Sequence, residues 1–563
     1  MKRIFISIAF SCLALGVWAQ DTYYAELLSR NNYYGTARSA ALGNAVTALG
    51  GDLGTIGINP AGSAVNAYSQ ITITPGLLFQ TTNTGWSTDG TENFGPASAT
   101  SHTKFNLPNG GFNLVFFTGR EYGVKQVSVG FVANNTNTFL NYSTGYGTND
   151  KTSFLGNLAA AAGGVSSGNM SRDLYTAYCA NQFGEYGVQG SNVYSGGNQM
   201  IDELDRYSYV PGLLNQSAAY NTYGSKTDFI INLGFNVSDS FYFGFNLGLP
   251  STRYRREDLF AENAQNPVLF PVNFEDQSGK HLGTEGEPTT YYKSSYNSYK
   301  LNTDATGVYG KFGFIWLPTK GLRLGAAIQT PAMLTVKENW QYAAQTSYED
   351  GKYNGSATSD LGEYSYRLRT PYMVDAGVAY TFGGFGLVSI DYELADYSVM
   401  KYSDFGNNFF GSDDWAYTNE ANRLFCGVSH SVRAGVEVKP LPKLSVRAGY
   451  NLVTDPEKYA TDSYGNIITA ENWPGSGTPL TTFRYFKNNT HTFSLGLGYS
   501  SDGSFFADAA VRLTKYPTVF YSPYYYGWYQ AVDKEGVPID TGMPLEKLDR
   551  KIVDVMLTIG WRF

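Results

Sequence analysis

The chain has 563 residues, a formal net charge of −8 and a mean hydropathy of −0.26. The negative balance argues against a nucleic-acid partner, and no stretch beyond the N-terminus approaches the ~20 apolar residues of a membrane-spanning helix, which excludes a helical membrane bundle. Aromatic residues make up 16% of the chain, with 45 Tyr and 35 Phe. That content suits the interfacial girdles of a membrane β-barrel.

The N-terminal region predicts two segments that precede the main fold. Residues 1–20 read as a signal peptide, because Lys2 and Arg3 precede an apolar stretch that ends in small residues. Residues 21–66 are rich in Gly and Ala, weakly periodic, and end in the turn sequence Asn59-Pro60-Ala61. Small residues pack tightly in a confined space, so we interpret residues 21–66 as a hatch that plugs a barrel of residues 67–563.

Strand-like segments recur from Tyr68 to the end of the chain. In Phe229–Val237 and Phe241–Leu249, for example, apolar residues occupy every second position, as in a strand with one apolar face. There are about fourteen such segments, and short and long connections alternate between them. This is typical of outer-membrane barrels with short periplasmic turns and long outer loops. We therefore predict an all-β, transmembrane antiparallel barrel of about 14 strands.

The longest connection and the last strand add detail to this prediction. Within the connection Ser143–Thr227 we expect short helices at Phe154–Ala162 and Met200–Asn221, over the barrel mouth. The run Lys551–Phe563 alternates apolar and polar residues and ends in Phe, as does the closing strand of an outer-membrane barrel. It indicates the outer membrane of a Gram-negative bacterium.

Charges of both signs lie on the strand faces opposite the apolar ones. An Arg or Lys that faces lipid at mid-depth costs about 2–4 kcal/mol, so these side chains are expected to face the lumen. There they either pair with each other and hold the hatch, or simply form the wetted wall of a pore. The candidates are Arg323, Asp375, Asp391, Glu393, Arg433, Glu437, Arg447, Asp508 and Arg512.

The Asn59-Pro60-Ala61 motif just before the first strand, the strand number and the aromatic C-terminus together resemble the FadL family of outer-membrane channels for long-chain fatty acids and hydrocarbons. The resemblance implies a monomeric, hatch-plugged barrel without a cofactor, in contact with outer-membrane lipid and lipopolysaccharide. It also implies that a hydrophobic ligand enters between the outer loops and leaves through a lateral gap, at an inward kink in the third strand.

The third strand contains a polar interruption, Asn134, Asn135, Thr136 and Asn137, after Val127–Ala133. Strand pairing can fail there and form a kink or bulge, at the position that the family uses for its lateral gap. Alternatively, the strand ends near Ala133 and a loop begins.

Other functions stay open at this level. A general porin for polar solutes suits the charged lumen and predicts no plug, and the Tyr-rich loops permit a surface receptor or adhesin. Enzymatic activity is not expected. Gly164–Gly168 matches the nucleophile-elbow pattern, but it lacks the strand–turn–helix context that this pattern needs. The four histidines show no metal-ligand spacing, and nothing predicts whether Cys179 and Cys426 pair.

Overall fold

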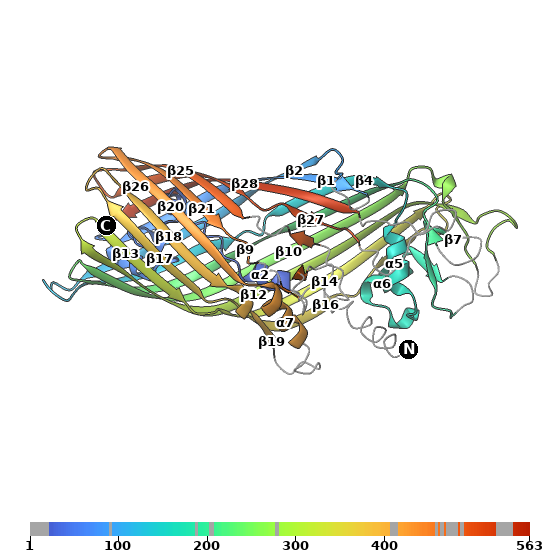
Figure 1. Ribbon diagram of the computed structural model, residues 1–563, viewed down its shortest axis with the longest axis horizontal. Helices are drawn as coiled ribbons and strands as arrows, with labels where there is room; N and C mark the ends of the chain where they lie inside the picture. Colours follow the sequence, from blue (N-terminus) through green and yellow to red (C-terminus); the bar gives the residue numbers. More distant parts are fainter. Residues whose placement is uncertain are drawn as a thin grey trace.

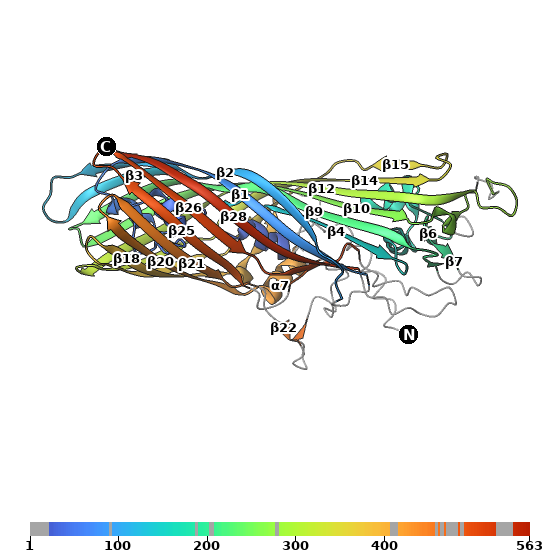
Figure 2. The same cartoon turned by 90° about the horizontal axis from the view of Figure 1, so that it is seen from above.

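The computed structural model describes residues 22–88, 93–185, 190–201, 208–275, 281–405, 415–456, 460–461, 467–468, 482–484, 489–524 and 544–563. The predicted signal peptide lies outside these described residues. The chain forms a long barrel with an N-terminal segment inside it (Figures 1 and 2). Of the helices in the described part, none is both long and apolar enough to cross a membrane. Cys179 and Cys426 are not joined by a disulfide.

The barrel closes because its first strand pairs with its last. β1 (Gln70–Ser87) is antiparallel to β2 (Ser98–Phe117) on one side and to β28 (Leu545–Arg562) on the other. Between them each strand pairs with its neighbours in sequence, all antiparallel. Those that run without a break within the described residues are β9 (Leu214–Val237), β10 (Phe241–Ala264), β12 (Thr290–Thr319), β20 (Val428–Leu441), β21 (Leu444–Val453) and β25 (Thr490–Ser500).

Five strands of the ring are interrupted partway at described residues. Three of the interruptions, 330–332, 370–372 and 516–518, contain a proline, which cannot donate a ladder hydrogen bond. With each interrupted strand counted once, the ring has fourteen strands, as predicted. The interrupted strands are β3 (Val124–Asn137) with β4 (Asn141–Asn149), β13 (Leu322–Gln329) with β14 (Met333–Tyr348), β16 (Gly362–Arg369) with β17 (Met373–Thr381), β18 (Gly386–Asp396) with β19 (Lys401–Asp404), and β26 (Phe505–Lys515) with β27 (Val519–Tyr521).

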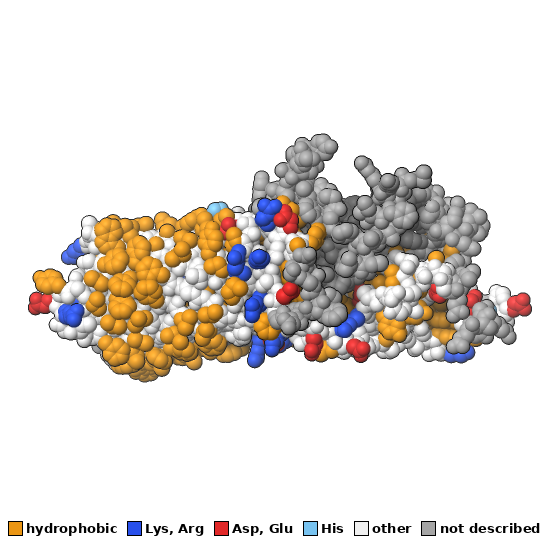
Figure 3. Space-filling view, turned by 90° about the horizontal axis from the view of Figure 1, so that it is seen from below, with side chains coloured by type: hydrophobic (Ala, Val, Ile, Leu, Met, Phe, Trp, Pro, Cys, Tyr) orange, Lys and Arg blue, Asp and Glu red, His pale blue; other side chains and the backbone are white. Residues whose placement is uncertain are grey.

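An apolar belt surrounds the half of the barrel that carries the short turns. Outward side chains such as Ile231, Leu247 and Val378 are 47–50% exposed, while alternate residues point inward and are buried. Figure 3 shows this belt ending at a row of basic side chains. A belt of this kind is stable only against lipid, so the barrel is transmembrane.

The strands continue far beyond the belt on the long-loop side. β10 has 24 residues and β12 has 30, whereas ~9–11 span a membrane. Much of what the sequence predicts as long connections is therefore strand, which the sequence concealed because both faces are largely polar there. The extension also carries α6 (Arg172–Cys179), β5 (Phe183–Glu185), β6 (Tyr194–Gly196), β7 (Met200–Ile201), β8 (Ser208–Tyr209), β11 (Pro271–Val272), β15 (Gly355–Thr358) and α7 (Ala416–Phe425).

The two helices predicted in the longest connection had different outcomes. Phe154–Ala162 is confirmed as α5, with Ser153 as its N-cap accepting a hydrogen bond from the amide of Leu155. The helix predicted for Met200–Asn221 is wrong. Its start is the short strand β7 and its end opens β9, where alternate residues are buried, while 202–207 lie outside the described residues.

Candidate functional site

The N-terminal segment fills the lumen at the height of the belt. It consists of α2 (Thr22–Ser29), α3 (Ala37–Ala41), α4 (Leu53–Ile56) and the 3₁₀ helix η2 (Pro60–Val65), joined by short turns. Figure 1 shows α2 inside the ring of strands. Most described side chains of 23–66 are buried. We call this segment the plug.

The Asn59-Pro60-Ala61 motif ties the plug to itself and to the wall. The Asn59 side-chain amide donates to the carbonyls of Thr47 (2.7 Å) in the plug and Phe314 (2.9 Å) in β12. Its Oδ1 accepts from the amide of Ala61 (3.1 Å), which caps η2. The Asn232 amide of β9 donates to the Pro60 carbonyl (3.0 Å). The motif therefore fixes the plug against two separate strands.

Inward-facing glycines let the plug lie directly on the wall. A Cβ on Gly313 would stand 2.1 Å from Asn59 Oδ1, and one on Gly244 would stand 2.5 Å from the Pro60 carbonyl oxygen. At such distances no side chain fits unless the plug shifts. Around the barrel, each of the following glycines would bring a Cβ within 3.0 Å of a plug atom: Gly234, Gly244, Gly313, Gly325, Gly377, Gly435, Gly449 and Gly496. We call these the glycine band.

The glycine band was not predicted, although the sequence carries a signal for it. In five strands a charged lumen residue precedes the glycine by two positions, on the same face of the strand. A recurring charge-x-Gly pattern thus indicates a wall that both holds and closely approaches an internal segment. The pairs are Lys311 with Gly313, Arg323 with Gly325, Asp375 with Gly377, Arg433 with Gly435, and Arg447 with Gly449.

One charge network lies on β12, β17, β18 and β20. Lys311 and Asp375 are fully buried and 3.0 Å apart. Arg433 lies 3.5 Å from Asp375 and pairs with Glu393. Asp391 instead holds the plug directly, accepting from the amide of Thr47 (2.6 Å). A buried charge is tolerated only with such partners.

A second network lies on β20, β21 and β26. Arg447 bridges Glu437 (2.6 Å) and Asp508 (2.5 Å), and Arg38 of the plug lies 3.4 Å from the same Glu437. Arg512 pairs with Asp554 of β28 and donates to the Tyr33 carbonyl of the plug (2.9 Å).

The nine charged residues predicted from the sequence therefore fall into two groups, those that contact the plug directly and those that pair with charges on the wall. Arg323 donates to the Leu49 carbonyl of the plug (2.8 Å), and Asp391, Glu437 and Arg512 also contact the plug directly. The remaining five pair with charges on the wall, although the Arg433 guanidinium also lies over the Tyr33 ring.

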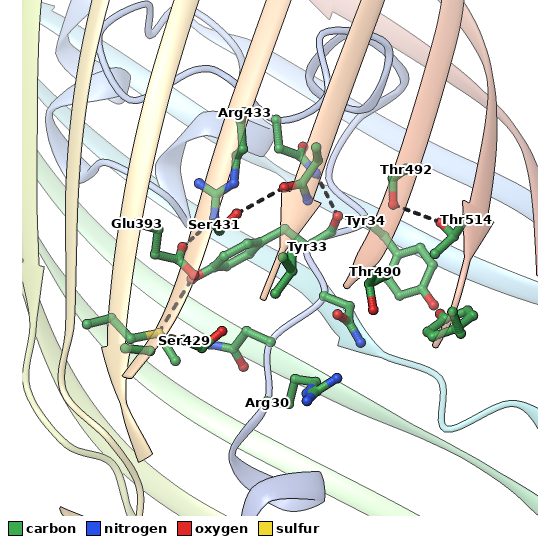
Figure 4. Close-up of a pocket in the computed structure, with 18 of the residues that line it drawn as sticks. Arg30, Tyr33, Tyr34, Glu393, Ser429, Ser431, Arg433, Thr490, Thr492 and Thr514 are labelled. Atoms are coloured by element: carbon green, nitrogen blue, oxygen red, sulfur yellow. Dashed lines mark hydrogen bonds and ion pairs between the residues drawn. The ribbon is translucent and has the colours of Figure 1, made fainter. Parts of the chain in front are cut away.

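Two polar cavities remain beside the plug. The first, of about 50 Å³, lies between Tyr33 and Tyr34 of the plug and the wall residues Ser431 and Thr492 (Figure 4). The second, of about 300 Å³, opens near the short turns and is lined by charged residues including Arg562. The first holds only about one or two waters.

The third strand loses one neighbour where the sequence becomes Asn-rich. The β2–β3 ladder ends at the pair Asn109 and Asn134. On the other side the ladder with β9 continues to Asn137, with a register shift after Asn135. The Asn137 side chain accepts from the amide of Phe139 (3.0 Å) and Phe139 has a φ of 52°, so the chain turns there.

The plug contacts the third strand at this same point. The amide of Asn32 donates to the Thr136 carbonyl (2.6 Å), and that of Tyr34 to the Asn135 carbonyl (3.3 Å). A Cβ on Gly57 would stand 2.6 Å from the Asn134 side-chain nitrogen. The backbone of the plug thus bonds to the strand just where β2 no longer does.

Beyond the turn, side chains hold β4 against β1 and β2. Gln80 donates to the Tyr142 carbonyl (2.8 Å) and accepts from the Tyr142 amide (3.0 Å). Lys104 donates to the Thr138 carbonyl (3.4 Å) and Ser98 to the Thr144 carbonyl. The His102 and Tyr142 rings stack at 4.0 Å. We call this contact the side-chain seam.

The closed ring, the lipid-facing belt and the internal plug define the class of protein: a plugged transmembrane β-barrel. No family model matches the chain, and no curated protein matches it. Among solved structures the chain is similar to a Pseudomonas aeruginosa FadL homologue, with 12% identity, a TM-score of 0.47, and 95% of this chain and 98% of that chain covered. It is also similar to the Pseudomonas putida toluene transporter TodX (12%, TM-score 0.43, 95% and 99%). A third similar structure is the monoaromatic hydrocarbon channel CymD (10%, TM-score 0.41, 95% and 99%). The register of the strands establishes the barrel without them.

Proposed function

We propose that this chain is a monomeric outer-membrane channel for the passive uptake of hydrophobic small molecules, such as long-chain fatty acids, and that the ligand leaves sideways through the barrel wall. In this proposal residues 21–66 act as the hatch, and Asn134–Asn137 mark the lateral exit. The observation that carries it is the end of the β2–β3 ladder at Asn134, level with a plug that fills the lumen.

The outer lumen offers an apolar route to that point. A cluster of buried aromatic side chains surrounds α2 on the long-loop side of the plug, including Tyr254, Tyr366, Tyr402 and Trp415. Phe139, at the turn of the third strand, belongs to the same cluster, and its ring lies 5.3 Å from that of Tyr254. These side chains are packed around α2, so an apolar solute would meet continuous apolar surface from the outer lumen to the break once α2 moves aside.

The plug is placed to control the exit. Its amides at Asn32 and Tyr34 bond to the third strand, and Lys226 of β9 donates to the Leu28 (2.9 Å) and Ser29 (3.1 Å) carbonyls at the end of α2. A ligand that displaces α2 breaks these bonds and frees the strand at its turn. Coupling of this kind needs no energy source beyond the binding of ligand.

The side-chain seam opens at a lower cost than a β-ladder of the same length. A β-ladder is held by successive backbone bonds of about 1 kcal/mol each, whereas β4 meets β1 and β2 through a few side chains that swing on their own rotamers. An opening there leads from the lumen to the outer edge of the belt and bypasses the plug.

A cross-link across the seam tests this proposal. In a chain with Cys179 and Cys426 replaced by Ala, His102→Cys and Tyr142→Cys are joined by a short bismaleimide, and uptake of a fluorescent fatty acid into proteoliposomes is measured. We expect uptake to fall to background. The matched control joins Ala219→Cys and Leu259→Cys, which face each other across the unbroken β9–β10 ladder, and should transport normally. Equal uptake with both cross-links would rule out exit through the seam.

A further inference from the structure

Four exposed basic side chains gather on the outer surface where the apolar belt ends. Lys337 lies on β14, Arg367 and Arg369 on β16, and Lys401 on β19, all pointing outward. Figure 3 shows basic side chains along this boundary. We call these four residues the basic row.

The height of the basic row matches the edge of the lipid core. Arg369 stands eleven residues beyond Tyr380, which lies at the short-turn end of β17. Eleven residues span roughly 36 Å along a strand and about 28 Å along the axis at a tilt of about 40°. The apolar band of such barrels is about 25 Å tall. The row therefore lies at headgroup level on the long-loop side.

Among the described residues, the basic row has no internal counter-charge. Arg369 and Lys401 are direct partners across β16 and β19, a like-charge arrangement that destabilises a sheet. The Arg369 guanidinium donates only to the Val399 carbonyl (3.0 Å). Within the described residues no carboxylate lies within 4.0 Å of a charged nitrogen of the row. The nearest acid by register, Asp304 opposite Lys337, is already paired with Arg255 (3.0 Å).

We infer that the basic row binds the phosphate groups of a glycolipid of the lipid A type in the outer leaflet, whose acyl chains lie on the belt below. The inference rests on the outer-membrane location in the proposed function. Guanidinium groups bind phosphate through two parallel hydrogen bonds, and Met333 and Tyr372, 45% and 36% exposed, offer apolar contact just below the row. An amphiphile with an anionic headgroup satisfies both features.

Native mass spectrometry of the detergent-purified full chain, with added lipid A, tests the inference. We expect the wild type to retain lipid A and Arg369→Gln with Lys401→Gln to bind it at least about tenfold more weakly. The control, Arg120→Gln with Lys320→Gln, removes the same charge from exposed residues at the short turns and should bind as the wild type does. Dephosphorylated lipid A should bind the wild type as weakly as lipid A binds Arg369→Gln with Lys401→Gln.

Three results would overturn the inference: equal lipid A binding by both double variants, an equal loss in both, or undiminished binding of the dephosphorylated lipid. Phosphatidylglycerol is tested alongside, and binding as tight as that of lipid A would assign the row to anionic phospholipid instead. Fatty-acid uptake into liposomes without glycolipid is measured separately. Uptake should be equal in wild type and Arg369→Gln with Lys401→Gln, and failure in both would refute the proposed function and not the lipid site.

Discussion

Two seams of the barrel wall are built in different ways. β9 and β10 pair without a register shift from Val237 and Phe241 at the short turn to Leu214 and Ala264 far outside the belt. β2 and β3 pair only from the short turn to Asn109 and Asn134, and the seam then continues through side chains. Backbone ladders form with almost any sequence, whereas a side-chain seam depends on particular residues. The β9–β10 seam is therefore a fixed wall, whereas at the β2–β3 seam the choice of side chains sets how easily the wall opens.

The largest effect is expected from removing the plug, which contacts both seams. Deletion of residues 22–66 leaves a lumen lined by charges on a fourteen-stranded ring, wide enough for water. We expect ionic conductance in planar bilayers to rise by about tenfold or more. The general-porin alternative expects the same conductance with and without the segment. Unfolding of the deleted form is checked by its heat-modifiable mobility on gels.

On β12, next to the fixed wall, the glycine band should be sensitive to a single methyl group. Gly313→Ala places a Cβ 2.1 Å from Asn59 Oδ1, so the plug must shift, at a cost of about 1–3 kcal/mol. Gly310→Ala on the same strand is the control, since the nearest atom to its Cβ is 4.0 Å away. Thermal unfolding in detergent should be lowered only by the first. Equal midpoints would contradict a tight plug–wall contact.

On the side-chain seam, Gln80→Leu should loosen β4 without affecting the ladders. It leaves the Tyr142 amide and carbonyl without their side-chain partner, at a cost of about 1–3 kcal/mol. Hydrogen exchange at Tyr142 should become faster, and fatty-acid uptake should rise. Asn83→Leu, exposed on the same strand, should change neither. Slower uptake in Gln80→Leu would argue that the seam guides the ligand instead of retaining it.

The smallest effect is expected far from both seams, in the extension beyond the belt. Glu262 accepts hydrogen bonds from the Phe154 amide (2.8 Å) and the Gln216 side chain (2.6 Å), yet its burial raises its pKa above the ordinary value. The folded state then holds the proton more tightly, so the free energy of unfolding falls as pH rises from the ordinary value through the raised one.

Glu262→Gln should remove this slope without changing uptake. Unfolding of the extension, followed by proteolysis between about pH 4 and 8, should depend less on pH in the variant than in the wild type. A slope of the same size in the variant would assign it to another group.

The sequence by itself determined the ring and which of its ends carries the short turns. Period-two alternation in segments such as Phe229–Val237 fixed which face meets lipid, and the closing run Lys551–Phe563 completed the count of strands. The charges that cannot face lipid were assigned to the lumen for the same energetic reason. These are local properties, since a side chain's face follows from its position in the strand. The helix at Phe154–Ala162 was also predictable from local sequence, because its N-cap serine immediately precedes it.

Tertiary structure decided the remaining features, because they depend on contacts between residues that are distant in sequence. Whether Asp391 holds the plug or, like Asp375, pairs with the wall depends on how Thr47 lies against β18. The true length of β12 was hidden because strands outside lipid lose the apolar alternation and are held by their neighbours' backbones. The glycine band is recognisable only once the plug is in place, and the Asn-rich stretch becomes a break only because β2 leaves the third strand where the plug amides of Asn32 and Tyr34 bond to it.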